Sequence, residues 1–142
     1  MNIKNVQLKG IKAERYADLT GGPMKVRIDH NSNLSRMEIL SDNVAKIEFQ
    51  YTASYGPIGV IKIEGTLEFQ GDHITSMVND WNSSRKMPND AASSIHTAIM
   101  HGCVPLAVGI AKDIRLPPPI PLPQVRLGKT QQKKGESGPE VA

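Results

Sequence analysis

Apolar and polar residues alternate one by one from residue 45 to residue 69, which is the most regular pattern in the chain. Odd-numbered positions are mostly apolar or aromatic and even-numbered positions are mostly polar, on both sides of the segment 56–59. A period of two is typical of strands that bury one face, and the glycine and proline residues of that segment favour a turn. The pattern therefore predicts a β-hairpin.

The register of this hairpin follows from the same alternation, because residues on one face must pair with each other. A three-residue loop pairs Phe49 with Gly65 and Lys46 with Glu68. A five-residue loop instead sets Glu48 opposite Glu68, and two like charges directly opposite each other are destabilising. We therefore expect the three-residue loop.

Two further strands are expected before the hairpin. Residues 3–16 predict a first strand, and a β-bulge at Gly10 explains the shift in apolar parity between Leu8 and Ile11. Residues 24–28 also alternate, and the turn-forming segment 20–23 precedes them. The sum is a four-stranded antiparallel meander with one apolar face.

The hydrophobic period becomes helical after residue 70. Apolar residues at positions 74, 77, 78 and 81 predict a short amphipathic helix after Asp72. A longer helix is expected to follow with Asp90 as its N-cap. Its expected apolar stripe comprises Ala92, Ile95, Ile99, Cys103, Leu106, Ile110 and Ile114. These helices and the sheet predict an α+β fold with the helices packed on one face of the sheet.

Pro105 lies inside the longer helix. Proline cannot donate the backbone hydrogen bond to His101, and its ring presses on that carbonyl, so we expect a kink or break near Gly102. Residues 102–111 include no charged or strongly polar residue. A helix that is apolar all round needs cover on a second side, and another protomer supplies it most simply. The expected oligomer interface comprises Cys103, Val104, Leu106, Val108 and Ile110.

A proline-rich segment follows the helix, with five prolines in the seven residues 117–123. Such a run must be extended, in the polyproline II conformation. Residues 128–142 are polar and contain no Ile, Leu or aromatic residue, so they are expected to form a disordered tail. The expected organisation is one domain over residues 1–127 and a tail over residues 128–142.

Composition excludes several classes of function. The chain has 142 residues, a net charge of +3 and a single cysteine, which excludes an internal disulfide and a zinc site built from several thiolates. The scattered basic residues do not indicate nucleic-acid binding. The first residues lack the apolar run of a signal peptide, and no apolar stretch is long enough to span a membrane, so we expect a cytoplasmic protein without membrane insertion.

Motifs for catalysis or cofactor binding are missing from the sequence. No nucleotide-binding glycine motif occurs, and no serine stands in the nucleophile elbow of a hydrolase. The four histidines do not form a ligand set, since His96 and His101 are five residues apart and do not share a helix face as an i, i+4 pair would. We therefore expect neither an enzyme nor a metal or other cofactor.

The order of the elements and one run of residues resemble the SecB export-chaperone family. The likeness rests on Cys103-Val104-Pro105-Leu106-Ala107, on Ala111, Ile114 and Arg115, on residues 116–125, and on Ile63-Glu64-Gly65. The resemblance implies a homotetramer, built as a dimer of dimers with helices sandwiched between two sheets. It also implies a molecular chaperone in protein transport, which holds unfolded or partly folded polypeptides in apolar grooves.

Three features depart from that family's pattern. Bacterial members are strongly acidic, whereas this chain is basic; their acidic sheet face docks the export motor SecA, whereas the expected face here mixes lysines and glutamates; and no zinc-binding tail follows Cys103. The alternative is an oligomeric interaction protein on the same fold, which binds one specific folded partner. The sequence leaves open the client, the export-motor partner and the choice between dimer and tetramer.

Seven apolar residues are candidates for polypeptide binding: Phe49, Tyr51, Tyr55, Phe69, Trp81, Ile120 and Leu122. The aromatic residues have two interpretations, core packing or the lining of a client groove, where rigid rings offer apolar area at low entropic cost. The proline run has a further interpretation, because Arg115, Pro118 and Pro121 match a basic P-x-x-P ligand of proline-binding domains.

Overall fold

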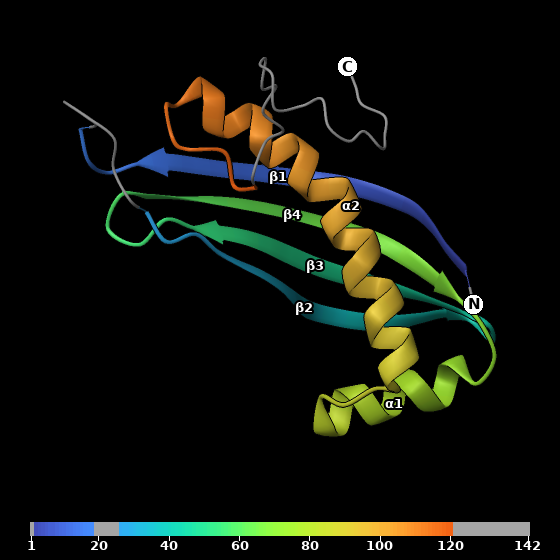
Figure 1. Cartoon of the computed structure of the whole chain (residues 1–142). Helices are drawn as coiled ribbons and strands as arrows, with labels where there is room; N and C mark the ends of the chain where they lie inside the picture. Colours follow the sequence, from blue (N-terminus) through green and yellow to red (C-terminus); the bar gives the residue numbers. More distant parts are fainter. Residues whose placement is uncertain (1, 19–25, 121–142) are drawn as a thin grey trace, which may run out of the picture.

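The computed structural model describes residues 2–18 and 26–120. Four strands are followed by two helices: β1 (Asn2–Arg15), β2 (Asp29–Ser41), β3 (Val44–Ser54), β4 (Gly59–Gln70), α1 (Ile74–Ser84) and α2 (Asn89–Asp113). The strands form one antiparallel sheet, and α2 crosses one of its faces (Figure 1). The α+β prediction is confirmed, whereas Leu122 and the predicted tail over residues 128–142 lie outside the described residues.

The order of the strands differs from the predicted meander. The strands lie side by side as β1-β4-β3-β2, so β1 pairs with β4 and not with β2. Three consecutive strands are joined as neighbours and the remaining strand lies beside the last of them, which is a Greek-key order. Alternation along a strand indicates which of its faces is buried, but it does not indicate which other strand pairs with it. The predicted meander was wrong for this reason.

The hairpin of β3 and β4 has the predicted register. Phe49 pairs with Gly65 and Lys46 pairs with Glu68. The Tyr55 N–H donates to the carbonyl of Gly59 over 2.9 Å, which closes the three-residue loop. Charge pairing and face matching were therefore sufficient to fix this register.

β1 pairs with β4 along its length but is interrupted twice. The pairing register shifts between Leu8 and Gly10, which confirms the predicted bulge at Gly10. A second shift lies between Lys4 and Gln7, next to Asn5 with a φ of 52°. The bulges bend the strand and let apolar residues of different parity face the helices.

β2 was not predicted from the sequence. The predicted strand over residues 24–28 is wrong at residues 26–28, which form no regular structure, and residues 24 and 25 lie outside the described residues; β2 begins at Asp29. Two residues that face the helices, His30 and Ser32, are polar, and a register shift between Leu34 and Arg36 breaks the alternation. An edge strand of this composition has no clear period of two.

The core lies between the sheet and α2. Alternate residues of β3 and β4 point into it, and several are completely buried, among them Ile47, Tyr51, Ile61, Ile63 and Leu67. The opposite sheet face carries lysines, glutamates and other polar side chains that are at least partly exposed, apart from Thr66. Its mixed sign agrees with the sequence-based expectation.

α1 has the predicted buried face, formed by Ile74, Met77, Val78 and Trp81. It ends at Arg85, whose φ of 61° is left-handed and whose N–H donates to the carbonyl of Trp81 over 2.8 Å. This left-handed cap stops the helix and turns the chain toward α2.

α2 begins and continues differently from the prediction. Its N-cap is Pro88, and Asp90 lies in the first turn, where its carboxylate accepts from the Ala91 N–H over 2.9 Å, so Asp90 as N-cap was wrong. The helix continues through Pro105 without a break. Its axis changes direction along its length in Figure 1, as expected where proline removes one backbone bond.

The buried stripe of α2 agrees with the prediction at Ile95, Ile99 and Cys103, whereas Ala91 is buried in place of the predicted Ala92, which is half-buried. The buried residues are Ala91, Ile95, Ile99, Cys103, Ala107 and Ala111. Steps of four residues exceed one helical turn by about 40°, so the stripe winds around the helix while α2 crosses all four strands. Leu106, Ile110 and Ile114, which were predicted in the stripe, are therefore only half-buried.

Candidate protein-interaction surface

Among residues 2–18 and 26–120, none covers the outer flank of α2 completely. Pro105 and Gly109 are exposed, and Val104, Leu106, Val108 and Ile110 are half-buried. Cys103 is completely buried against the sheet, so it belongs to the chain's own core and has no surface for an interface. Four of the five predicted interface residues therefore keep some exposed surface, and their role in an interface stays a prediction.

Apolar side chains of β1 extend this flank. Val6, Leu8 and Ile11 are 40%, 39% and 53% exposed. The Cγ1 atom of Val6 lies 3.7 Å from the position that a β-carbon on Gly102 would take, so β1 passes directly along α2. Leu106 and Ile110 follow Gly102 at intervals of four and share its side of the helix.

These apolar residues of β1 and α2 form one surface, which we call the helix-edge surface. It comprises Val6, Leu8, Ile11, Pro105, Leu106, Gly109 and Ile110. None of these seven residues is charged, and segment 102–111 of α2 contains no charged side chain. Exposed apolar residues that lie close together are candidates for an interaction surface.

The apolar composition of α2 also matches that of a membrane-spanning helix. Among the described residues it is the one helix whose length and composition would allow it to cross a membrane, and 28% of the relevant segment is buried in the chain. Its packed face lies against all four strands, as in the core helix of a folded domain.

The five aromatic candidates lie in the core. Phe49, Tyr51, Tyr55, Phe69 and Trp81 are at most 5% exposed. Core packing therefore describes their role in this chain, and in this conformation they offer a client almost no surface. Trp81 alone among them contributes to the larger groove described next.

A groove of about 780 Å³ lies between β2 and the corner where α1 leads into α2. We call it the β2 groove. Its lining residues are Ser32, Asn33, Leu34, Ser35, Trp81, Arg85, Lys86, Met87, Asn89, Ala92 and His96. The set includes two cationic side chains and no acidic one, together with an edge strand and apolar atoms of Trp81 and Met87.

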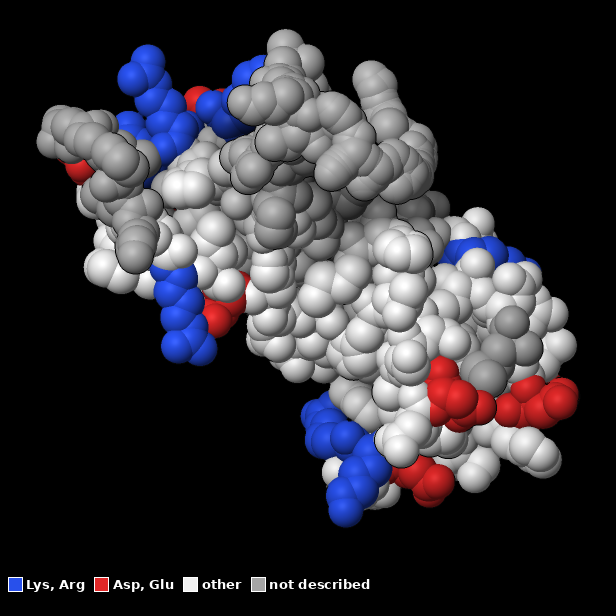
Figure 2. Space-filling model, viewed as in Figure 1, with Lys and Arg blue, Asp and Glu red and all other residues white. Residues whose placement is uncertain are grey.

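The cationic end of the β2 groove is partly ordered by an aromatic ring. The guanidinium carbon of Arg85 lies 4.1 Å from the centre of the Trp81 ring, a cation–π contact. Within residues 2–18 and 26–120, neither Arg85 nor Lys86 has an acidic partner within ion-pair distance. Basic side chains also gather at this end of α1 in Figure 2.

The segment after α2 is fixed to the sheet by two carbonyl groups. The Tyr55 O–H donates to the carbonyl of Pro117 over 2.7 Å, and His30 Nε2 lies 2.6 Å from the carbonyl of Pro119. Because a carbonyl only accepts, His30 carries its proton on Nε2, and Nδ1 accepts from the Tyr51 O–H at 2.7 Å. We call residues 116–119 the proline strap.

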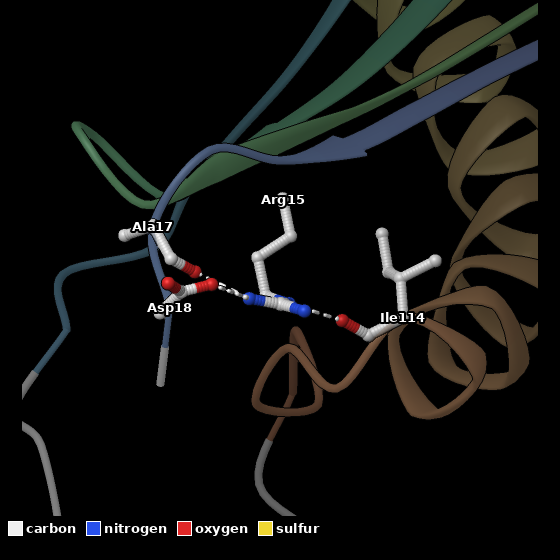
Figure 3. A network of polar contacts seen from close by, with 4 residues as sticks. All are labelled: Arg15, Ala17, Asp18 and Ile114. Carbon is white, nitrogen blue, oxygen red and sulfur yellow. Dashed lines mark hydrogen bonds and ion pairs between the residues drawn. The ribbon is translucent and has the colours of Figure 1, made fainter. Parts of the chain in front are cut away.

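The proline strap begins at a clamp between β1 and the end of α2 (Figure 3). Arg15 donates from Nε to the carbonyl of Ile114 over 2.9 Å and from a terminal nitrogen to the carbonyl of Ala17. Asp18 lies 3.7 Å from the same guanidinium but is almost fully exposed. The clamp joins residues 99 positions apart in sequence.

The proline strap carries or borders the candidate residues that remain, which belong to the proline run. Pro119 is buried and Pro118 is exposed, while Ile120 is 38% exposed and does not line the β2 groove. Pro121 of the P-x-x-P pattern lies outside the described residues. Since two strap carbonyls already accept hydrogen bonds from the chain's own side chains, a proline-binding domain would have to displace them.

The titratable groups of the core are held neutral. Burial raises the pKa of Tyr55 to about 12 and the pKa of the Cys103 thiol to about 11. Burial, followed by the neighbouring Tyr55 and Cys103, raises the pKa of Tyr51 to about 12. A thiol with a raised pKa is a poor nucleophile.

The β2 groove also brings two polar side chains, Ser32 and His96, into contact. Ser32 and His96 form a hydrogen bond at the β2 groove, and within the described part of the chain no acidic side chain orients the imidazole. In the same residues no three His, Cys, Asp or Glu side chains are grouped as metal ligands. The arrangement offers contact surface and hydrogen bonds to a partner.

Comparison with known proteins supports a fold and not a family membership. No family model matches the chain, and no curated protein matches its sequence. A SecB-like chaperone of Mycobacterium tuberculosis, solved in complex with a ChAD peptide from the HigA1 antitoxin, matches with a TM-score of 0.57 and 11% identity over 88% of this chain and 89% of that one. A Streptococcus agalactiae protein of unknown function matches with a TM-score of 0.46 and 13% identity over 87% and 96%. The sheet followed by two helices is thus a SecB-like fold.

Proposed function

We propose that this protein is a SecB-like molecular chaperone that associates with copies of itself and holds non-native polypeptide segments. The observation that carries the proposal is the helix-edge surface, where Ile11 is 53% exposed beside a helix flank without charges. Burying apolar area contributes about 25 cal/mol per Å², so such a surface favours contact with another apolar chain.

Two kinds of partner divide the surface between them. Copies of the chain cover the flank of α2 in this proposal, since a rigid helix presents the same residues in every copy. Extended polypeptides use the β2 groove and whatever part of the helix-edge surface the assembly leaves open. The fold shared with a SecB-like chaperone that binds a peptide supports polypeptide binding in this proposal.

Suppression of aggregation tests the holding function. Insulin reduced with dithiothreitol is a suitable client, because the protein's single cysteine forms no disulfide that the reductant would break. We expect equimolar protein to suppress light scattering from the aggregating insulin chains. Unchanged scattering at equimolar protein contradicts the proposal.

A matched pair of variants locates the effect on the helix-edge surface. Ile11→Lys puts a charge on the apolar face of β1, whereas Gln7→Lys puts the same charge on an exposed position that pairs with Thr66. Suppression is expected to weaken in Ile11→Lys alone. Equal loss in both variants would show that charge in general, and not this surface, was responsible.

The alternative function is binding to one specific partner. The M. tuberculosis neighbour is in complex with a peptide from one antitoxin, which is compatible with a dedicated partner as much as with general chaperoning. A dedicated protein would leave insulin aggregation and the aggregation of a second unrelated client unchanged. It would give a single stoichiometric complex in a pull-down.

A further inference from the structure

We infer that the β2 groove binds an extended polypeptide segment that carries a carboxylate, and that it prefers such a segment to neutral or basic ones. The inference rests on the proposed function and adds a chemical preference to it. It follows from three features that meet in the groove: a strand edge that no other described strand pairs with, an apolar floor, and two cations without an acidic partner among the described residues.

The strand edge determines the conformation of the partner. β2 stands last in the strand order, so among the described residues no strand pairs with its outer side. Four residues of β2 line the groove, and three of them, Ser32, Asn33 and Ser35, have small or polar side chains, while Leu34 packs against the core. An extended segment can donate to and accept from such an edge.

The register shift in β2 sets the length of this pairing. It lies between Leu34 and Arg36, at the end of the lining stretch. A bulge interrupts regular pairing on an edge. The usable straight edge therefore runs from Asp29 to Leu34, and a partner strand pairs along this stretch and not along all of β2.

The cations determine the charge of the partner. Arg85 and Lys86 follow α1 directly and line the groove, which contains no acidic side chain. Among the described residues, the nearby Asp90 lies within ion-pair distance of neither cation, and its carboxylate accepts from the Ala91 N–H. The Trp81 ring holds the guanidinium of Arg85 in place, which reduces the entropy lost when a carboxylate binds.

The floor of the groove accommodates an apolar neighbour of that carboxylate. Trp81 and Met87 expose part of their side chains to the groove, and Ala92 leaves room at the start of α2. Methionine adapts to side chains of different shapes. The expected ligand is an extended segment in which an apolar residue and an acidic residue lie close together.

Three synthetic peptides of ten residues test the preference. All are rich in Thr and Val with one central Phe, and they differ in two positions that are Glu, Gln or Lys. We expect the Glu peptide to bind about fivefold more tightly than the Gln peptide, as partly exposed ion pairs allow, and the Lys peptide to bind most weakly. Fluorescence anisotropy measures the affinity, and the single Trp81 reports directly from the groove.

Three charge-reversed variants test the two cations, and the last of them is the matched control. Lys86→Glu keeps the contact of Arg85 with Trp81, and the double variant Arg85→Glu/Lys86→Glu removes both cations. Lys12→Glu/Lys62→Glu makes the same change in net charge on a cross-strand pair of the opposite sheet face. The order Glu, Gln, Lys is expected to reverse in Arg85→Glu/Lys86→Glu and to persist in Lys12→Glu/Lys62→Glu.

Pairing with the strand edge is tested by a Glu peptide that is N-methylated at alternate residues. This peptide keeps its charges but loses the N–H groups of one edge, so its affinity should fall at least as far as that of the Gln peptide. Unchanged affinity after N-methylation overturns the strand-pairing part of the inference.

The outcomes separate the inference from the proposed function. Equal binding of the three peptides, binding without a change in Trp81 emission, or an equal response of both double variants overturns the inference and leaves a general polypeptide-binding function standing. Absence of binding by any peptide, together with unsuppressed insulin aggregation, contradicts both.

Discussion

Phe49 and Gly65 face each other across β3 and β4, and the Cζ atom of the phenylalanine lies 2.7 Å from the position that a β-carbon on Gly65 would occupy. The backbone carbonyl of Gln7, on the bulged strand β1, lies close to the same position. Glycine is therefore required here, because it allows the ring and β1 to approach the central strand together.

Gly65→Ala is expected to lower the free energy of unfolding by about 1–3 kcal/mol, since the new methyl group forces β1 or the ring to move. Urea unfolding followed by Trp81 fluorescence measures it. Gly10→Ala is the control on the neighbouring strand, because its β-carbon would meet only a flexible Glu64 oxygen at 3.9 Å. Equal stability of the two variants would contradict the crowding at Gly65.

The clamp between β1 and α2 predicts that Arg15 contributes to the stability of the fold and that Asp18 does not. Arg15→Gln loses the bond to the Ile114 carbonyl and should lower the free energy of unfolding by about 1–2 kcal/mol. Asp18→Asn should leave stability unchanged, because its side chain is 95% exposed and water screens the ion pair. Comparable losses in the two variants would mean that the ion pair, and not the carbonyl contact, holds the clamp.

Tyr55→Phe removes the donor to the Pro117 carbonyl and leaves that acceptor half-buried. We expect a loss of about 1 kcal/mol in the free energy of unfolding. Tyr16→Phe is the control, at a position that is 57% exposed. If thermal or urea unfolding of Tyr55→Phe coincides with that of the control, the proline strap contributes nothing to stability.

Stability should fall in alkaline solution. Burial raises the pKa of Tyr51 and Tyr55 from 10.0 to about 12 and that of Cys103 from 9.0 to about 11. The unfolded chain loses these protons first, so their contribution is complete below pH 9 and is lost as the pH rises to about 12. Urea titrations between pH 8 and pH 12 measure the fall, and it should become smaller in Tyr55→Phe. A free energy of unfolding that stays constant to about pH 12 would show that these groups are not buried as described.

The molar mass in solution should exceed the 15.5 kDa of one chain, because α2 leaves an apolar flank uncovered. Leu106→Glu with Ile110→Glu should reduce the mass to that of one chain, measured by light scattering after size exclusion. Ser93→Glu with Ser94→Glu places the same charges on an exposed part of the same helix and should leave the assembly intact. A wild-type protein with the mass of one chain would refute association through this flank.

The amino-acid sequence by itself determined the hairpin, its register, the bulge beside Gly10 and the short helix. These features depend on neighbours along one or two strands or one helix face, such as Lys46 with Glu68 and the residues around Trp81. Periodicity and charge are sufficient for interactions of that range.

The tertiary structure alone decided which strand pairs with β1, which residues of the second half of α2 are buried and where the proline strap runs. β1 lies beside β4 in the sheet. The alternation of residues within β1 would be the same if β1 paired with β2, so the sequence pattern could not distinguish the two arrangements. Ala107 faces the sheet in place of Leu106 because α2 crosses the strands obliquely and its contact stripe winds around it. The β2 groove likewise exists only where Ser32, Trp81 and His96, far apart in sequence, are brought together by packing.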